Sequence, residues 1–289
     1  MNEISETIIL RRLALLVPLL FVIGCAPTVI RPALEAGNGL PTTSTRELTQ
    51  ALQTAEKNLR SIDALGKVRI STTENRMRAS QVVMAQSPDT FRIEVLGPFG
   101  VSYAVASDGK TLAALSTQEN VIFRGRPDAN TIAEVIGIAL APKDMTSLLL
   151  GRPPVQAQAL KSLWISNRPA SDVATLPESP LYFLHAADGQ DTSVVIGFAR
   201  LIVRKKVRIV PVSFQRIARN GQQLLKASFE AWTMIDGLPL SHRIRIHTAA
   251  TEAVIEYTEI IPNKALLPGT FRIMTPEGTA ERALGSARP

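Results

Sequence analysis

The order of apolar and polar residues divides the chain, from about residue 44 onward, into a few helical segments and a larger number of strands. Apolar residues recur every third or fourth position between Ser44 and Ile62, and Ser44 with Glu47 has the spacing of a capping box. This pattern predicts an amphipathic helix whose apolar side lies on another surface. Most later segments alternate every second residue, which is typical of strands with one buried side.

Two groups of strands are predicted, with a pair of helices between them. Turn sequences such as Asp108-Gly109 separate the strands, so we expect neighbouring strands to be antiparallel. Thr131 with Glu134 is expected to cap the first central helix, and Pro142 to lie in the first turn of the second. The predicted strands cover residues 65–71, 76–85, 90–96, 101–107 and 111–116 before the helices, and 181–186, 193–198, 201–204, 207–217, 222–234, 240–247, 253–261 and 269–274 after an irregular connection over 155–180.

One predicted strand shows the expected two-sidedness clearly. Ile244 and Ile246 point to one face, whereas Arg243, Arg245 and His247 point to the other. About thirteen strands, with helices that carry apolar faces, predict a mainly β protein with some α structure. We expect an open, incomplete antiparallel β-barrel with helices covering its concave face.

The first residues read as an export signal. Residues 13–23 form an uncharged apolar run that is shorter than the ~20 residues of a membrane-spanning helix. The run ends at Val22-Ile23-Gly24-Cys25, which resembles the lipobox of bacterial lipoproteins. That resemblance implies lipidation of Cys25 after cleavage; the alternative is an ordinary cysteine near a cleavage site. Because Ala26 rather than aspartate follows, the same resemblance implies the outer membrane, facing the periplasm.

Composition and charge bound the organisation of the chain. We expect a signal peptide over 1–24, a flexible tether over 25–44, one folded domain over 45–276 and a disordered tail over 277–289. The formal net charge of +7 suits a protein beside anionic lipid headgroups and suits nucleic acid equally. The export signal argues against a nucleic-acid partner.

The densest basic cluster consists of Arg204, Lys205, Lys206 and Arg208. These residues are either solvated loop charges or contacts for the phosphates of anionic lipids. Both interpretations place the cluster at the surface.

The sequence lacks the motifs of common catalytic and metal sites. No HExxH, GxSxG, P-loop or CxxC pattern occurs. His242 and His247 lie five residues apart on a predicted strand and therefore face opposite sides, so they cannot jointly bind one metal ion without distortion. We expect no enzymatic activity, no metal site and no cofactor.

Three segments in order give the chain a family resemblance. They are residues 91–96 leading through Pro98-Phe99-Gly100 into 101–106, residues 133–153, and Asn263 followed by 271–273. The first is similar to a strand-turn-strand unit, the second to paired lid helices with a Leu-Gly-x-Pro ending, and the third to a closing strand of the LolA/LolB family of lipoprotein-localisation factors. The chain resembles the LolB branch more closely, but is longer than a typical member between residues 154 and 220.

The resemblance implies a half-open barrel whose concave face takes up acyl chains of lipids or lipoproteins. It also makes a periplasmic LolA-like carrier a candidate partner, with the outer membrane reached through lipidated Cys25. Phe99 corresponds to the exposed turn residue implicated in delivery into the membrane. A phenyl ring between Pro98 and Gly100 either stays exposed or folds back to cap the end of the barrel.

The candidate cavity residues come from one strand and the two central helices. They are Phe91, Ile93 and Val95 from the strand, and Ile132, Val135, Ile136, Leu148 and Leu149 from the helices. The same residues would equally make a closed core. We expect an outer-membrane lipoprotein that binds acyl chains and helps receive or insert lipoproteins. The alternative is an assembly lipoprotein that uses the same fold as a protein-binding scaffold.

Overall fold

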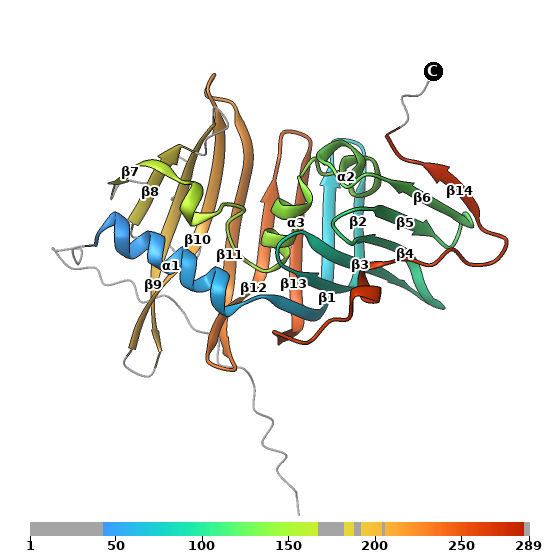
Figure 1. The fold of residues 1–289 in the computed structure, drawn as a ribbon, viewed down its shortest axis with the longest axis horizontal. Coiled ribbons are helices and arrows are strands. Elements are labelled where there is room, and N and C mark those ends of the chain that lie inside the picture. The colour runs from blue at the N-terminus through green and yellow to red at the C-terminus, as the bar shows by residue number, and fades with distance from the viewer. Residues whose placement is uncertain (1–42, 167–181, 188–191, 204–205, 286–289) are drawn as a thin grey trace, which may run out of the picture.

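The computed structural model describes residues 43–166, 182–187, 192–203 and 206–285, and the predicted signal peptide and Cys25 lie outside them. Within these residues, fourteen strands form one curved sheet in the order β14-β6-β5-β4-β3-β2-β1-β13-β12-β11-β10-β9-β8-β7 (Figure 1). The first and last strands of this order do not pair with each other, so the sheet is not closed. The predicted open, mainly β architecture is confirmed.

The strands of the first half form a meander that closes back on the second half through the pairing of β1 with β13. They are β1 (Ser61–Thr72), β2 (Arg76–Gln86), β3 (Thr90–Gly97), β4 (Gly100–Ser107), β5 (Leu112–Ser116) and β6 (Val121–Gly125). The later strands are β7 (Lys161–Ser166), β8 (Tyr182–Ala187), β9 (Thr192–Val203), β10 (Lys206–Ala218), β11 (Gln223–Ile235), β12 (Leu238–His247), β13 (Thr251–Pro262) and β14 (Ala280–Ala283).

Among the described residues, three α-helices accompany the sheet, namely α1 (Thr45–Asn58), α2 (Ala129–Ile136) and α3 (Pro142–Leu149). Helix α1 lies across the half of the sheet formed by β9, β10 and β11, while α3 lies against β2 and β3 (Figure 1). Leu240 lies against the α1 side and Ile246 against the α2/α3 side, and both are even-numbered inward positions of β12. The helices therefore cover the same face of the sheet.

Local side-chain bonds explain where the helices begin. The Ser44 hydroxyl accepts a hydrogen bond from the Glu47 backbone N–H at 3.1 Å, which confirms the predicted cap of α1. The predicted cap of α2 at Thr131 is wrong. Asp128 caps this helix instead, because its carboxylate accepts from the N–H of Thr131 at 3.0 Å while the Thr131 hydroxyl accepts from the Asp128 N–H at 3.1 Å.

The predicted two faces of β12 are confirmed. Ile244 and Ile246 are buried, whereas the guanidinium groups of Arg243 and Arg245 lie on the opposite side and pair with neighbouring strands. Arg243 contacts Glu256 of β13 at 2.9 Å, and Arg245 contacts a buried carboxylate of β11 at the same distance. Cross-strand ion pairs therefore neutralise the outer face in this part of the sheet.

The alternating pattern fails at short or weakly patterned segments. It misses β6 and β7, and it divides the single strand β9 into two. The strand predicted at 269–274 is wrong, because the 3-10 helix η2 (Pro268–Phe271) forms there and is held by the Arg92 guanidinium, which donates to the carbonyl groups of Thr270 and Arg272. The tail predicted as disordered from 277 is also wrong, because β14 pairs in parallel with β6.

A close approach between β1 and β13 requires a glycine. Gly66 lies beside a register shift, and a Cβ atom there would stand 2.3 Å from the backbone oxygen of Glu256. This bulge bends the sheet at the junction between its two halves. The region inside the bend is where the larger cavity lies.

Candidate binding cavities

One hollow lies beneath α2 and α3 and another beneath α1; the first, called the larger cavity, has a volume of about 510 Å³. Its walls come from β1 to β5, from β12 and β13, and from α2 and α3. Most lining side chains are aliphatic, and the polar ones include Thr72, Asn75, Gln81 and Gln118. The volume lies in the range of small-molecule sites, which is about 300–1,000 Å³.

The strand register shows the depth of each residue in this cavity. In a meander, the β1–β2, β3–β4 and β5–β6 turns lie at one edge of the sheet. Thr72, Asn75 and Gln118 lie at or next to these turns and are exposed, so they mark the mouth. One row further in, Val95 pairs with Tyr103, and the next row pairs Ile93 with Val105. The cavity therefore becomes wholly aliphatic as it deepens.

Five of the eight predicted cavity residues line this space. They are Ile93 and Val95 of β3, Val135 and Ile136 of α2, and Leu149 of α3. The predicted combination of one strand and two covering helices is therefore present, and the binding of a ligand by these residues stays a prediction.

The other three predicted cavity residues are corrected by the structure. Phe91, Ile132 and Leu148 are each 0% exposed and lie in the packed core rather than in the cavity wall. Phe91 shares the inward face of Ile93 but lies one row deeper, opposite Ser107. It belongs to the floor beneath the cavity.

Hydrogen bonds hold the helical cover against the sheet. Tyr103 donates through its hydroxyl to the carbonyl of Val135 at 2.9 Å, and burial, followed by the negative charge of Glu119, raises its pKa to about 12. On β13, Tyr257 is fully buried and donates to the carbonyl of Leu149 at 2.9 Å, and burial raises its pKa above the ordinary value. The phenols thus stay neutral donors at physiological pH.

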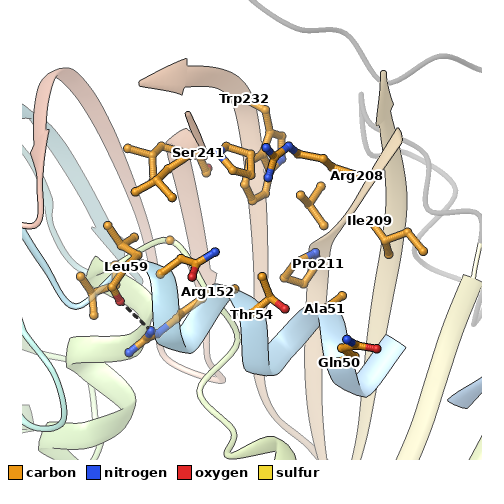
Figure 2. A pocket seen from close by; sticks show the side chains of 18 of the residues that line it. Gln50, Ala51, Thr54, Leu59, Arg152, Arg208, Ile209, Pro211, Trp232 and Ser241 are labelled. Carbon is orange, nitrogen blue, oxygen red and sulfur yellow. Dashed lines mark hydrogen bonds between the residues drawn. The ribbon is translucent and has the colours of Figure 1, made fainter. Parts of the chain in front are cut away.

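A second hollow of about 310 Å³ lies between α1 and the strands β10, β11 and β12 (Figure 2). Ala51 and Thr54 of α1 face Pro211 and Trp232 of the sheet across this space (Figure 2). Its lining is more mixed than that of the larger cavity, since Arg208 and Glu47 contribute charge. The two hollows are neighbours, because Leu149 lines the first and Leu150 lines the second.

Arg152 forms one end of the second hollow and fixes the end of α1. Its guanidinium donates to the carbonyl of Leu59 at 3.0 Å (Figure 2). It also donates to the Glu56 carbonyl and to the Ser87 hydroxyl. Burial lowers the pKa of Arg152 to about 10, so the group remains protonated at neutral pH. This cation compensates the partial negative charge at the carboxyl end of the helix.

The predicted membrane-contact residues lie partly outside the described residues. Arg204 and Lys205 are not described, whereas Lys206 and Arg208 are exposed at the start of β10. Phe99 is 104% exposed on the turn between β3 and β4, so the alternative that its ring folds back onto the barrel is wrong. Contact of these residues with lipid stays a prediction.

Neither a metal site nor a spanning helix is found in the described part of the chain. No group of three or more His, Cys, Asp and Glu side chains there is arranged to hold a metal ion. No helix among the described residues has the length and apolar character needed to cross a membrane.

The comparisons with known proteins agree with the architecture. No family model and no curated protein matches the sequence. A DUF1329 family protein from Desulfovibrio piger gives a TM-score of 0.53 at 10% identity, over 80% of this chain and 98% of that chain. A domain described as an outer membrane lipoprotein-sorting protein from Vibrio parahaemolyticus gives 0.50 at 10% identity, over 79% and 97%. This chain has the fold that these two proteins share.

A LolA superfamily protein from Nitrosomonas europaea is also similar, with a TM-score of 0.45 at 10% identity over 80% of this chain and 99% of that chain. The fold expected from the sequence resemblance is confirmed by the first two structures. At this identity the likeness concerns architecture, and the function has to be argued from the cavity.

Sequence reasoning missed Gln81, a polar residue in the cavity wall. Gln81 is 2% exposed and occupies an inward position of β2, between the apolar inward residues Ala79 and Val83. The signal was present in the sequence, because a glutamine interrupts the apolar phase of an alternating strand. This signal comes from the strand β2 alone, so it indicates the cavity wall independently of the helices that cover the sheet.

Proposed function

We propose that this protein binds the acyl chains of lipids or lipoproteins in the larger cavity. The observation that carries the proposal is the cavity itself, about 510 Å³ of space with aliphatic walls beneath a polar, exposed mouth. A protein-binding scaffold would have no need to keep such a space unfilled, because close packing of the same side chains would stabilise the fold.

The energetics of this binding follow from apolar burial alone. Each methylene group removed from water contributes about 0.8 kcal/mol, so about ten methylenes in the cavity would contribute about 8 kcal/mol. Part of this is offset by the lost freedom of the ligand. The proposed activity is binding and release without a covalent step, so no catalytic residue is required.

We further propose that the protein receives or inserts lipoproteins at the periplasmic face of the outer membrane, with a LolA-like carrier as donor. The lipobox-like Cys25 and the fold that the chain shares with a lipoprotein-sorting domain support this role. The position of Phe99 adds support, because the β3–β4 turn lies at the same edge of the sheet as the cavity mouth. A chain leaving the mouth would thus be near the residue proposed to enter the bilayer.

The binding proposal is tested by filling each hollow in turn. Ala253 of β13 lines the larger cavity and is 2% exposed, so Ala253→Phe places a ring in that space. Ala51 of α1 lines the second hollow, and Ala51→Phe is the matched control. Both variants would be titrated with a fluorescent long-chain fatty acid, and their folding compared by circular dichroism and thermal unfolding.

We expect Ala253→Phe to weaken fatty-acid binding at least about tenfold and Ala51→Phe to leave it unchanged. Unchanged binding by a folded Ala253→Phe variant would contradict the proposal. A loss confined to Ala51→Phe would place the acyl chain in the second hollow instead. The cargo itself would be identified by mass spectrometry of lipoproteins that are mislocalised after depletion of the protein.

A further inference from the structure

We infer that Gln81 binds a carbonyl oxygen of the cargo, so that the larger cavity selects acyl esters or amides over plain hydrocarbon chains. This inference rests on the proposed acyl-chain binding and specifies which part of the ligand is recognised. It is carried by a buried polar group that has no partner within the described part of the chain.

The side-chain nitrogen of Gln81 is buried and has no hydrogen-bond partner among the described residues. Gln81 as a whole is 2% exposed and lines the larger cavity. A buried donor without an acceptor is unfavourable, and native proteins contain few of them. A hydrogen-bond acceptor on the ligand would satisfy the Gln81 donor.

The residues paired with Gln81 in the sheet provide no side-chain acceptor. In the sheet register its neighbours are Gly66 on β1 and Val95 on β3, neither of which has a polar side chain. Along β2 the adjacent inward positions are Ala79 and Val83. The Gln81 amide therefore lies among apolar neighbours on its own strand, and its side chain lines the cavity.

The position of Gln81 fits the chemistry of an acyl ligand. It lies in the row of Val95 and Tyr103, between the β3–β4 turn and the aliphatic row of Ile93 and Val105. An acyl group has the same order of parts, with a polar head, one carbonyl and then a hydrocarbon tail. The amide N–H groups of Gln81 can donate to that carbonyl while the tail enters the deeper row.

The test compares two ligands that differ only at the carbonyl. Palmitoyl lysophosphatidylcholine carries an ester, and its hexadecyl ether analogue has the same headgroup and chain without the carbonyl oxygen. Both would be titrated below their micelle concentrations into the protein from residue 25 onward with Cys25→Ser, so that its own lipid does not compete. The variant Gln81→Met keeps the side-chain length and removes the donor, and Ser80→Ala, on the outward side of β2, is the matched control.

We expect the unchanged chain and Ser80→Ala to bind the ester about fivefold more tightly than the ether, because one hydrogen bond is lost with the ether. In Gln81→Met the preference should disappear, with ether binding retained. Equal binding of the ester and the ether by the unchanged chain would overturn the inference. A preference for the ester that persists in Gln81→Met would overturn it as well. Both results would leave the acyl-binding proposal intact. Failure of the unchanged chain to bind either ligand would instead contradict the proposed function. Gln81→Leu provides a second variant if the methionine variant does not fold.

Discussion

The exposed ring of Phe99 gives the most direct test of a membrane-contacting role. The side chain is 104% exposed on the β3–β4 turn, so it has almost no contacts to lose when it is replaced. Transfer of a phenyl ring from water into an apolar phase contributes about 2–3 kcal/mol. The substitution Phe99→Ser should therefore lower vesicle binding by about 30- to 150-fold if the ring enters the bilayer completely.

The assay is cosedimentation of the chain from residue 25, carrying Cys25→Ser, with vesicles of phosphatidylethanolamine and phosphatidylglycerol. Leu267 is the matched control, because it is 75% exposed but follows the end of β13 at the opposite edge of the sheet. Leu267→Ser should bind like the unchanged chain, and Phe99→Trp should retain binding. A loss below about twofold in Phe99→Ser, or an equal loss in Leu267→Ser, would refute the reasoning.

Three further predictions concern the bonds that hold the cover and the edge of the sheet. Tyr257→Phe removes the hydroxyl that donates to the Leu149 carbonyl and should lower the free energy of unfolding by about 1–2 kcal/mol, measured by urea denaturation; no change would show that the bond is dispensable. Arg152→Met leaves two α1 carbonyls without their buried cation and should cost about 3 kcal/mol in the same assay, whereas a loss under about 1 kcal/mol would contradict that role. Burial lowers the pKa of His185 in the folded protein below the ordinary value of 6.5. As the pH drops below about 6.5, the unfolded chain therefore binds the proton before the folded chain does, and the free energy of unfolding should fall until the pH reaches the lower pKa of the folded state. Because the rings of His185 and Trp164 are stacked 3.7 Å apart, tryptophan fluorescence should follow this titration and lose it in His185→Gln; a fluorescence titration that persists in that variant would contradict the assignment.

The sequence predicts well which side of the sheet a residue faces, but it predicts poorly how deep that residue lies beneath the cavity mouth. Alternation correctly assigns Ile93 and Val95 to the inward side of β3, and it assigns Phe91 to the same side. Whether an inward residue lines a cavity or lies beneath it depends on its row in the sheet, which the pairing of β3 with β4 decides. The same limit applies to the helices, where Leu149 lines the cavity and Leu148 is buried in the core.

Tertiary contacts also decide the segments that the pattern misplaces. Residues 269–274 have an alternating sequence, but Arg92 binds carbonyl groups there that a strand would have used for pairing. In the sequence, Asp128 with Thr131 and Thr131 with Glu134 both have the spacing of a capping box. The structure selects Asp128, because its carboxylate accepts hydrogen bonds from two backbone N–H groups. In contrast, Gln81 was visible in the sequence as a polar residue in an apolar phase.

The strand β14 has a consequence for an open sheet of this kind. A barrel that does not close leaves its border strands with free backbone donors and acceptors, and such borders template the addition of further chains. Here residues 280–283 occupy the border at β6, and Gly125 lets Leu284 approach so closely that an added Cβ atom would stand 2.7 Å from the Leu284 Cβ. Deleting this strand should leave the cavity intact and expose the border of β6 to pairing with a second chain, which size-exclusion chromatography would detect as a larger particle than that of the unchanged chain.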